Sequence, residues 1–418
     1  MSILIKNVLL NNKKKDIFIQ DNKISEIKNK IIHEAEFKID GSGKAVIPSF
    51  VNAHTHAAMT LFRGYADDLQ LNEWLKKKIW PNELRLTEKR VYIGTKLACL
   101  EMIKSGTTYF NDMYFRFGSS AQAVKDMGMR ACINTALTDF LGRFQGKMMI
   151  KKNLKLYEKY KDFNPKMQIS SGAHSIYTIS QEFLEWMRDF TEEKDILIHF
   201  HISETEKEVK DCVKKHKMRP VEYLDSIGFL SRRLVAAHCV WVNEKEVRIL
   251  AKRNVQVVHN PVSNLKLAIN KIFPYQLYKK YGSNVCLGTD GAASNNSLSM
   301  FNTMKTAALI QKYSHNDPRV LPADECLKLA TLNGFKCFGL DGGIIKEGKL
   351  ADLLLIDLKV PEMVPNHNLV SNIVYSGNAS CVDTTICDGK ILMQNRKVKG
   401  EEEILEAARI TAKKFLRW

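Results

Sequence analysis

An apolar run over residues 47–53 leads directly into the triplet His54-Thr55-His56. In an extended strand, residues two apart point to the same face, so both imidazoles leave the backbone in one direction and can share one ion. The spacing alone fits an ordinary pair of polar histidines equally well, since histidine is also common outside metal sites. The decision between a metal site and a chance pair therefore depends on the rest of the chain.

Short apolar strands alternate with amphipathic helices from residue 47 to about residue 340. Repeated strand-helix alternation predicts a parallel sheet covered by helices, and about eight such units predict an α/β fold of the (β/α)8 TIM type. A doubly wound open sheet is the alternative. The expected strands lie at residues 108–113, 130–137, 167–173, 196–202, 234–238, 255–258 and 285–289. The expected helices include residues 88–105, 119–127, 150–160, 180–191, 207–216, 221–226 and 243–253.

The two ends of the chain carry short strands and polar or glycine turns instead, including an expected strand over residues 372–375. Small antiparallel strands cannot close a core alone, so the strands of one end need those of the other. A chain of 418 residues that is 45% hydrophobic also exceeds what one core usually supports. We therefore expect a small β-sandwich domain from residues 1–46 plus 345–395, a barrel over residues 47–344, and a C-terminal helix over residues 396–418 packed on the body.

Composition argues against several classes of protein. The net charge of +17 would suit a nucleic-acid binder, but the lysines stand in short scattered runs without interleaved aromatics. The nine cysteines form no Cys-x-x-Cys pair, which indicates free thiols in a reducing compartment. The N-terminus alternates like a strand, and no stretch approaches the roughly 18 apolar residues of a membrane span. We expect a cytoplasmic protein with no nucleic-acid or membrane partner.

Polar side chains gather where the expected barrel strands end. Barrel enzymes place their active sites at the C-terminal rim of the barrel, so residues at strand ends are the candidates for chemistry. Six of the eleven histidines and one aspartate stand at such positions: His54, His56, His174, His199, His201, His238 and Asp290. Chance would scatter these histidines along the chain, so their placement favours a metal-dependent active site.

Four nitrogen and oxygen donors suit one catalytic Zn²⁺, with Fe²⁺ or Mn²⁺ as alternatives. Asp290 and the pair His54 and His56 supply three, and spacing cannot choose between His199 and His201 for the fourth. Glu204, three residues after His201, would place a carboxylate near the metal, which favours His201 and leaves His199 as a structural histidine bonded to the backbone. No lysine ends the strand before His174, where a two-metal hydrolase needs a carbamylated bridge, so we expect one ion per chain.

These residues belong to motifs that together resemble the amidohydrolase superfamily, and within it the deaminases of 5′-methylthioadenosine, S-adenosylhomocysteine and 5′-deoxyadenosine. The resemblance covers nearly the whole chain and rests on residues 46–56, 80–83, 172–175, 199–205, 238–239, 259–264 and 287–296. It implies that the metal ligands are His54, His56, His201 and Asp290. It also implies that substrate contacts come from Glu83, His174, Glu204 and Asp290.

The resemblance implies hydrolytic deamination of an adenine nucleoside. Asp290 would take the proton of the attacking water, Glu204 would protonate the ring nitrogen next to C6, and His238 would steady the tetrahedral centre. Glu83 would accept hydrogen bonds from the ribose diol. Each residue also has an ordinary structural reading: a solvated helix-start carboxylate for Glu83, and a structural histidine for His174 and His238. His259 could cap a turn or line the pocket.

Residues 138–147 depart from the pattern of relatives that hold an amino-acid tail on the nucleoside, which usually carry one or two arginines there. This chain offers Arg143 alone, with Asp139 close by to oppose the charge of the tail. We therefore expect small 5′ substituents to be accepted at least as well as S-adenosylhomocysteine. The apolar residues that could cover a small 5′ group are Met59, Trp74, Phe140, Leu141 and Phe144.

Other functions remain open on the same scaffold. A deaminase of a free nucleobase, guanine or cytosine, or a triazine-type hydrolase would keep the metal site but would not need Glu83 for a ribose. A catalytically dead barrel could act as a binding scaffold, although this chain keeps all four candidate ligands and both proton-handling residues. The expected partners are a small nucleoside substrate and further copies of the chain in a homodimer or homotetramer.

Overall fold

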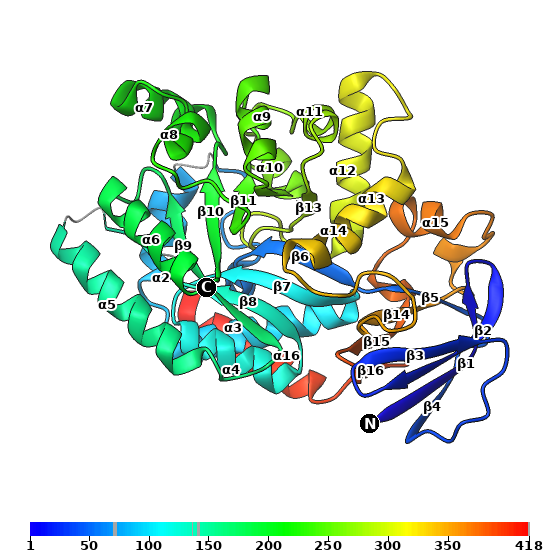
Figure 1. Cartoon of the computed structure of the whole chain (residues 1–418). Helices are drawn as coiled ribbons and strands as arrows, with labels where there is room; N and C mark the ends of the chain where they lie inside the picture. The colour runs from blue at the N-terminus through cyan, green and yellow to red at the C-terminus, as the bar shows by residue number, and fades with distance from the viewer. Residues whose placement is uncertain (70–72, 136, 140–142, 417–418) are drawn as a thin grey trace.

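Eight parallel strands form the centre of the molecule, in the order β13-β12-β11-β10-β9-β8-β7-β6 (Figure 1). The computed structural model describes residues 1–69, 73–135, 137–139 and 143–416, without the side chains of residues 143, 144 and 416. The strands are β6 (Phe50–Thr55), β7 (Thr107–Met113), β8 (Arg130–Asn134), β9 (Met167–Ser175), β10 (Leu197–Ile202), β11 (Leu234–His238), β12 (Gln256–His259) and β13 (Val285–Leu287).

The sheet nearly closes on itself. β13 lies against β6, and the backbone N–H of Asp290 donates to the carbonyl of His54 at 3.0 Å just beyond the two strands. Helices follow most strands and cover the outside of the ring (Figure 1). The predicted (β/α)8 barrel is therefore confirmed.

Helices follow most barrel strands, as expected, and further helices occur in the last third of the chain. They are α2 (Trp80–Glu83), α3 (Glu88–Lys104), α4 (Phe117–Met127), α5 (Arg143–Tyr160), α6 (Gln181–Glu193), α7 (Glu206–His216), α8 (Pro220–Ser226), α9 (Glu244–Lys252), α10 (Pro261–Lys266), α11 (Tyr275–Lys280), α12 (Met300–His315), α13 (Ala323–Ala330), α14 (Leu332–Cys337), α15 (Leu369–Tyr375) and α16 (Glu401–Leu416). The 3-10 helices are η1 (Ala57–Phe62), η3 (Pro361–Met363) and η4 (Ala379–Cys381), and η2 (Trp74–Ile79) is a π-helix.

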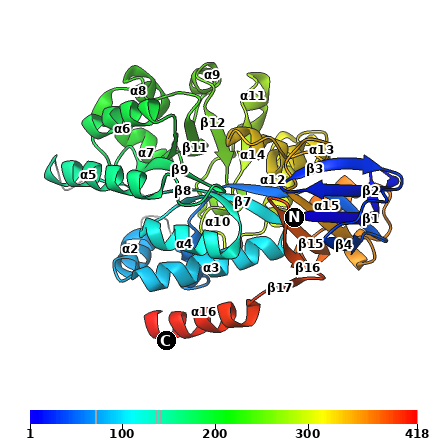
Figure 2. The same cartoon turned by 60° about the horizontal axis from the view of Figure 1, so that its bottom comes forward.

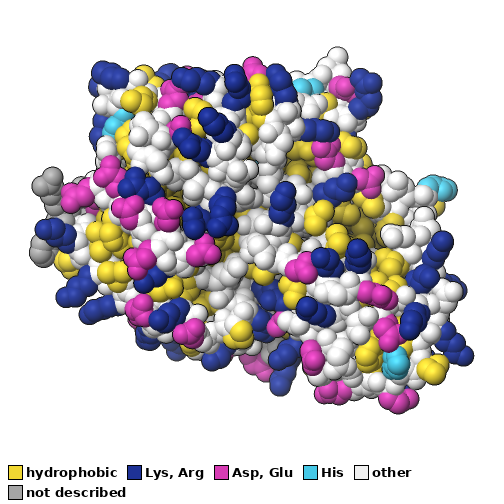
Figure 3. Space-filling model, viewed as in Figure 1, with side chains coloured by type: hydrophobic (Ala, Val, Ile, Leu, Met, Phe, Trp, Pro, Cys, Tyr) yellow, Lys and Arg dark blue, Asp and Glu magenta, His cyan; other side chains and the backbone are white. Residues whose placement is uncertain are grey.

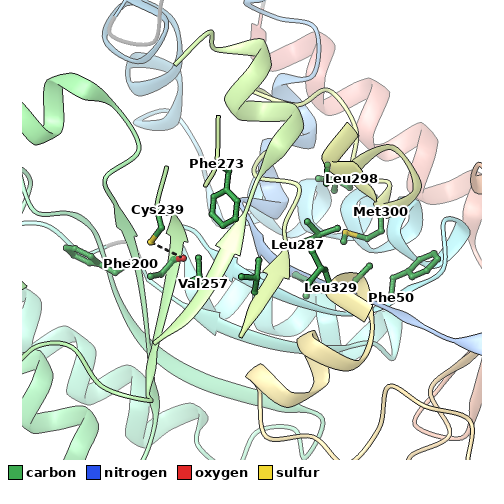
Figure 4. Packing of buried hydrophobic residues seen from close by; sticks show 14 of the residues in the cluster. Phe50, Phe200, Cys239, Val257, Phe273, Leu287, Leu298, Met300 and Leu329 are labelled. Atoms are coloured by element: carbon green, nitrogen blue, oxygen red, sulfur yellow. Dashed lines mark hydrogen bonds between the residues drawn. The ribbon is translucent and has the colours of Figure 1, made fainter. Parts of the chain in front are cut away.

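Two apolar layers hold the barrel. The outer layer lies between strands and helices, where Phe200, Val257 and Phe273 pack (Figure 4). The inner layer includes Val258, and it extends to Phe335 of α14. Val257 and Val258 belong to different layers because successive residues of a strand point to opposite faces. By the same alternation, the next residue of β12, His259, points to the same face as Val257.

Strands from both ends of the chain form a second sheet of nine strands beside the barrel (Figures 1 and 2). They are β1 (Ser2–Leu10), β2 (Lys13–Gln20), β3 (Lys23–Lys28), β4 (Phe37–Asp40), β5 (Lys44–Pro48), β14 (Leu353–Asp357), β15 (Val382–Cys387), β16 (Lys390–Gln394) and β17 (Lys397–Val398). β5 from the N-terminal part pairs antiparallel with β14 from the C-terminal part, so the small domain takes the form of one composite sheet.

One predicted element is wrong. Residues 372–375 belong to helix α15, where the sequence pattern predicted a strand. The Asn368 side chain accepts a hydrogen bond from the N–H of Ser371 at 2.9 Å and thereby caps the helix. Ile373 and Val374 are fully buried, and α15 lies against α12 and α13. An apolar pair buried by neighbouring helices reads like a strand when only the sequence is considered.

The surface view shows Lys and Arg scattered among Asp and Glu over the visible face, as on an ordinary solvated surface (Figure 3). All nine cysteines are free and buried, as expected. Among the described residues, no helix combines the length and apolarity that crossing a lipid bilayer requires.

Candidate active site

The predicted ligands meet at the C-terminal end of the barrel. His54 is the penultimate residue of β6 and is fully buried, His56 comes directly after this strand, and Asp290 comes shortly after β13. Oδ1 of Asp290 lies 3.4 Å from Nε2 of His54 and 3.3 Å from Nε2 of His56. The three ligand atoms lie within 4.8 Å of one another. A second group, His54 with His201 and His238, meets the same limit.

Hydrogen bonds to backbone carbonyls determine the tautomers of two of these histidines. Nδ1 of His56 lies 2.6 Å from the carbonyl of Met113, and Nδ1 of His201 lies 2.6 Å from the carbonyl of His174. A carbonyl can only accept, so Nδ1 donates in both rings, and in the neutral ring Nε2 keeps its lone pair. Metal-binding histidines are typically held in this way. Nε2 of His54 is buried with no hydrogen-bond partner, as a ligand atom facing a cation site would be.

His199 contacts this group on the Nδ1 side of His54, away from Asp290. Its Nε2 lies 2.7 Å from Nδ1 of His54, and its Nδ1 lies 3.1 Å from the Asn134 side-chain amide. The ring is fully buried. His199 is thus bonded to side chains, where a bond to the backbone was expected. If His54 uses Nε2 for a metal, its Nδ1 donates to His199.

Asp290 is held by several donors at once. Oδ2 accepts from the hydroxyls of Ser263, at 2.6 Å, and Ser294, at 3.0 Å, while Oδ1 accepts from the N–H of Gly291 at 2.8 Å. Burial alone would raise the pKa of Asp290, but His54 and His56 hold that pKa well below its usual range. The carboxylate is therefore ionised and oriented toward the histidines.

Burial keeps most of the histidines neutral. It lowers the pKa of His54, of His174 and of His238 to about 4. Burial would lower the pKa of His56 too, but the hydrogen bond and the charge of Asp290, with the Met113 carbonyl and the charge of Asp112, together outweigh it and raise this pKa to about 9. A cation bound between His56 and Asp290 would replace that proton, as metal ligands are deprotonated on binding. The donor set and its charge thus fit a divalent metal.

Glu204 and His238 stand side by side near the candidate ligands. Oε1 of Glu204 lies 3.9 Å from Nε2 of His238, whose Nδ1 accepts from the Asn264 amide at 2.9 Å. Burial raises the pKa of Glu204 to about 8, and the negative charge of Asp290 adds to the rise. A carboxyl with this pKa still carries its proton at neutral pH and can act as a general acid.

Glu83 and His174 line other sides of the site. Burial raises the pKa of Glu83 to about 7 against the lowering effects of Tyr114 and His56, so Glu83 is not a freely solvated helix-start carboxylate. The His174 ring lies 4.9 Å from the ring of His201, and its Nδ1 lies 3.0 Å from the Ser175 hydroxyl. Both residues therefore lie at the group of candidate ligands.

His259 lies away from this group. Strand alternation in β12 turns its ring outward, where it stacks on Phe273 with ring centroids 4.2 Å apart. Both ring nitrogens are buried without a hydrogen-bond partner, and burial lowers the pKa of His259 to about 3. His259 therefore packs in the helix layer and does not line the pocket.

The loop over residues 138–147 is described only in part. Asp139 is buried, and its carboxylate accepts from the N–H of Ser180 at 2.7 Å and from the Ser180 hydroxyl. Ser180 therefore engages both oxygens of Asp139. That the charge of Asp139 opposes an amino-acid tail stays a prediction. Met59 and Trp74 are buried together in one apolar cluster. Phe140 and Leu141 lie outside the described residues, as do the side chains of Arg143 and Phe144.

Several residues of the site escaped the sequence reasoning. Ser263, Ser294, Asn134 and Asn264 hold Asp290, His199 and His238, yet they come from three different segments of the chain. Ser263 and Asn264 lie in the noticed motif over residues 259–264, which gave a signal but no assignment. Ser294 lies in the noticed motif over residues 287–296 in the same way. Asn134 is an ordinary small polar residue whose partner depends on tertiary structure.

Comparisons with known proteins agree with this geometry. The sequence matches the Amidohydrolase family over residues 45–392. It is 48% identical over 423 residues to the 5-methylthioadenosine/S-adenosylhomocysteine deaminase 1 of Archaeoglobus fulgidus, covering 99% of both chains. It is 47% identical over 422 residues to the 5′-deoxyadenosine deaminase of Methanoregula boonei, covering 100% of this chain and 96% of the relative. A zinc-bound adenosine deaminase from Xanthomonas campestris has a similar structure, with a TM-score of 0.93, 31% identity, and coverage of 99% and 98%.

Proposed function

This chain belongs to the amidohydrolase family, and from that membership we propose that it hydrolyses 5′-modified adenosines to the corresponding inosines with release of ammonia. The observation that carries the proposal is the near-full-length identity of 47–48% to two relatives named for deamination of such nucleosides. The site supports it independently, because a protonated carboxyl, an ionised carboxylate and several neutral histidines converge at the end of the barrel.

His54, His56, His201 and Asp290 would hold one metal ion per chain, and the proposed ion is Zn²⁺. The Nδ1 contacts of His56 and His201 leave their Nε2 atoms as lone-pair donors, which supports this ligand set. When bound, zinc lowers the pKa of a water molecule from near 16 to about 7 and so supplies a nucleophile at neutral pH. Fe²⁺ or Mn²⁺ would suit the same nitrogen and oxygen donors.

Two carboxyl groups divide the proton transfers. Glu204 enters the reaction protonated and donates to the ring nitrogen next to C6, which makes C6 a better electrophile. Asp290 is ionised and accepts the proton of the attacking water. His238 donates a hydrogen bond to the new oxygen at C6 and so stabilises the tetrahedral centre. The water oxygen stays on C6, and the amino group leaves with a proton as ammonia.

Glu83 would accept hydrogen bonds from the two ribose hydroxyls, and His174 would contact the substrate beside His201. The accepting form of Glu83 is its carboxylate, which two donating hydroxyls would favour. A nucleoside is thereby distinguished from a free base, since a base brings no hydroxyl groups to the half-buried Glu83. A 5′-phosphate has no cationic partner assigned to it, so AMP would be excluded.

We place small uncharged 5′ groups among the preferred substrates. Arg143 is the only arginine of residues 138–147, so a single guanidinium is on offer for an amino-acid tail. Losing an arginine-carboxylate pair costs roughly 1.5 to 3 kcal/mol, which is about one to two decades of kcat/KM. We expect 5′-deoxyadenosine and 5′-methylthioadenosine to be converted at least as efficiently as S-adenosylhomocysteine.

Loss of adenine absorbance and release of ammonia provide the test. The purified metal-loaded protein is offered adenosine, 5′-deoxyadenosine, 5′-methylthioadenosine, S-adenosylhomocysteine and AMP, with guanine, cytosine and a chlorotriazine as alternatives. Turnover of the 5′-modified adenosines alone supports the proposal. Turnover of a free base or a triazine with no nucleoside activity would replace it, and S-adenosylhomocysteine tenfold above both smaller nucleosides would overturn the expected range. Metal analysis should find one ion per chain.

The proposal also covers the setting of the enzyme. Nine free, buried thiols fit a reducing compartment, for which we take the cytoplasm. A homodimer or homotetramer is the expected assembly, and light scattering of the purified protein measures it directly.

A further inference from the structure

The C-terminal helix α16 returns to the barrel and runs along α3 toward η1 (Figure 2). Near its end, Phe415 is fully buried, although most of the neighbouring residues of the helix are exposed or half-exposed. Phe415 belongs to the apolar cluster that also contains Phe62, Trp74 and Tyr114. The segment between β6 and α3, which carries Glu83, is built around this cluster.

Three side chains surround the Phe415 ring. Cζ of Arg90 lies 4.6 Å from the ring centroid and Cζ of Arg85 lies 5.2 Å from it, both in cation-π positions. The Phe62 ring of η1 lies 5.5 Å away, centroid to centroid. The Arg90 guanidinium also donates to the backbone carbonyl of Arg85 at 2.6 Å. Arg85, Arg90 and the Phe415 ring thus form one connected unit.

Two connections lead from this unit to Asn82, the residue before Glu83. Arg85 Nη1 donates to Oδ1 of Asn82 at 3.1 Å. On the other side, Phe62 contacts Tyr65, and the Tyr65 hydroxyl accepts from Nδ2 of Asn82 at 3.1 Å. Asn82 is buried, and its amide is thus held from both sides by groups that lead back to Phe415.

The helical turn that carries Glu83 needs such external support. α2 (Trp80–Glu83) is the end of a short helical run that begins with η2 at Trp74, and an isolated helical run of that length is marginal in water. Leu84, which follows Glu83, is 86% exposed and contributes little packing. The position of the Glu83 carboxyl therefore depends on what holds the neighbouring Asn82 and Arg85.

We propose that Phe415 is a positioning residue for Glu83, and that the end of the C-terminal helix thereby helps to set the affinity for the nucleoside. The inference rests on the proposed contact between Glu83 and the ribose. Phe415 itself touches no reacting group. Its ring orients Arg85 and, through Phe62, Tyr65. Arg85 and Tyr65 hold Asn82, and Asn82 holds the turn that presents the carboxylate to the sugar.

The test compares Phe415→Ala with Ile404→Ala in the full-length, metal-loaded protein. Ile404 is also buried on α16 but lies near the start of the helix, so its truncation loosens the helix without touching the Arg85 contact. Phe415→Ala should raise KM and lower kcat/KM for 5′-deoxyadenosine by about ten- to hundredfold, as displaced substrate-positioning groups do. kcat and metal content should stay near wild type, and Ile404→Ala should leave KM unchanged.

Two further readouts separate positioning from general destabilisation. In a Glu83→Gln background, Phe415→Ala should cost much less than in the wild type, because the group it positions is already impaired. Hydrogen exchange of the peptide covering residues 80–86 should accelerate in Phe415→Ala and not in Ile404→Ala. Phe415→Leu, which keeps most of the buried area but no aromatic face, replaces Phe415→Ala if the latter does not fold.

Equal effects of Phe415→Ala and Ile404→Ala on KM and on exchange would overturn the inference, as would an undiminished loss in the Glu83→Gln background. Failure of the proposed function looks different. A wild-type protein that converts no nucleoside would refute the proposed substrate, and the exchange of residues 80–86 would still decide whether Phe415 supports this turn.

Discussion

His54 is bonded to His199 through Nδ1, and this contact determines which of its nitrogens faces Asp290. A histidine that binds a metal through Nε2 must donate from Nδ1, and the acceptor of that proton orients the ring. When His54 binds a metal through Nε2, His199 would be that acceptor, in the place that a carboxylate or a backbone carbonyl often takes. His199 thus belongs to the metal site without being one of its proposed ligands.

Replacing His199 with Ala should weaken metal affinity by about 10- to 100-fold, since His54 loses the partner that fixes its tautomer. The measurement is a competition titration against a chelator. His259→Phe is the control, because His259 is an equally buried strand-end histidine that stacks on Phe273 outside the site. Equal affinities of wild type and His199→Ala would show that His54 needs no such partner.

Replacing Glu204 with Gln should reduce kcat by about 10²- to 10⁴-fold, the usual contribution of a general acid. Burial raises the pKa of Glu204 to about 8, so the acid form is present below that pH and is lost as pH rises through it. A bound cation would lower this pKa, which puts the alkaline limb of kcat/KM at or below about pH 8. The limb should vanish in Glu204→Gln, and a variant that keeps it would assign the limb to another group.

At the scale of elements, the sharp bend after β10 aims Glu204 into the site. Ser203 has a positive φ of 50°, and the first turn of α7 holds this bend. The buried Glu208 carboxylate accepts from the N–H of Ser203 at 2.7 Å and from the N–H of Glu204 at 2.9 Å. The Thr205 hydroxyl caps the same helix by accepting from the N–H of Glu208 at 3.2 Å. The helix start thus positions the general acid.

Glu208→Gln should destabilise the protein by about 1–3 kcal/mol, because one of two buried N–H groups would face an amide donor in place of an acceptor. kcat should fall as well, since Glu204 loses its fixed backbone. Urea unfolding gives the first quantity and initial rates the second. Glu206→Gln is the matched control in the same turn, where the carboxylate is exposed and pairs with Lys210. A loss there equal to that of Glu208→Gln would contradict the argument.

At the scale of the whole molecule, a buried ion network joins the barrel to the composite sheet. Arg130, at the start of β8, lies 3.2 Å from Oδ1 of Asp352 and also pairs with Asp388, both of which belong to the small domain. Arg130 and Asp352 are buried. The two domains are thereby joined at the end of the barrel opposite to the active site, so this contact bears on stability and not on chemistry.

Arg130→Met should lower the free energy of unfolding by roughly 3–5 kcal/mol, because it leaves a buried carboxylate without its partner. Chemical denaturation measures the change. Arg319→Met provides the comparison, since the Arg319 side chain is 88% exposed and its pair with Asp317 should contribute no more than about 1 kcal/mol. Similar losses in both variants would mean that the interdomain pair is solvated.

Much of this molecule follows from local patterns in the sequence. The pairing of His54 with His56, the run of barrel strands and the capped start of α7 depend on residues a few positions apart, where strand alternation and helix periodicity apply directly. The same local rule places the candidate residues at one end of a parallel barrel, because every strand of such a barrel ends on the same side. The candidate metal ligands could therefore be named from the sequence and its family resemblance together.

Tertiary structure decided which partner each of these residues has. His199 bonds to His54, His259 turns toward Phe273, and Asp139 is held by Ser180, although the sequence shows three similar polar residues near strand ends. Residues 372–375 became a helix because α12 and α13 bury one side of it. Phe415 reaches Arg85 from the far end of the chain. Such contacts depend on how segments distant in the sequence pack against one another. The hydrophobic periodicity of one segment predicts its own helix or strand but not its packing partners.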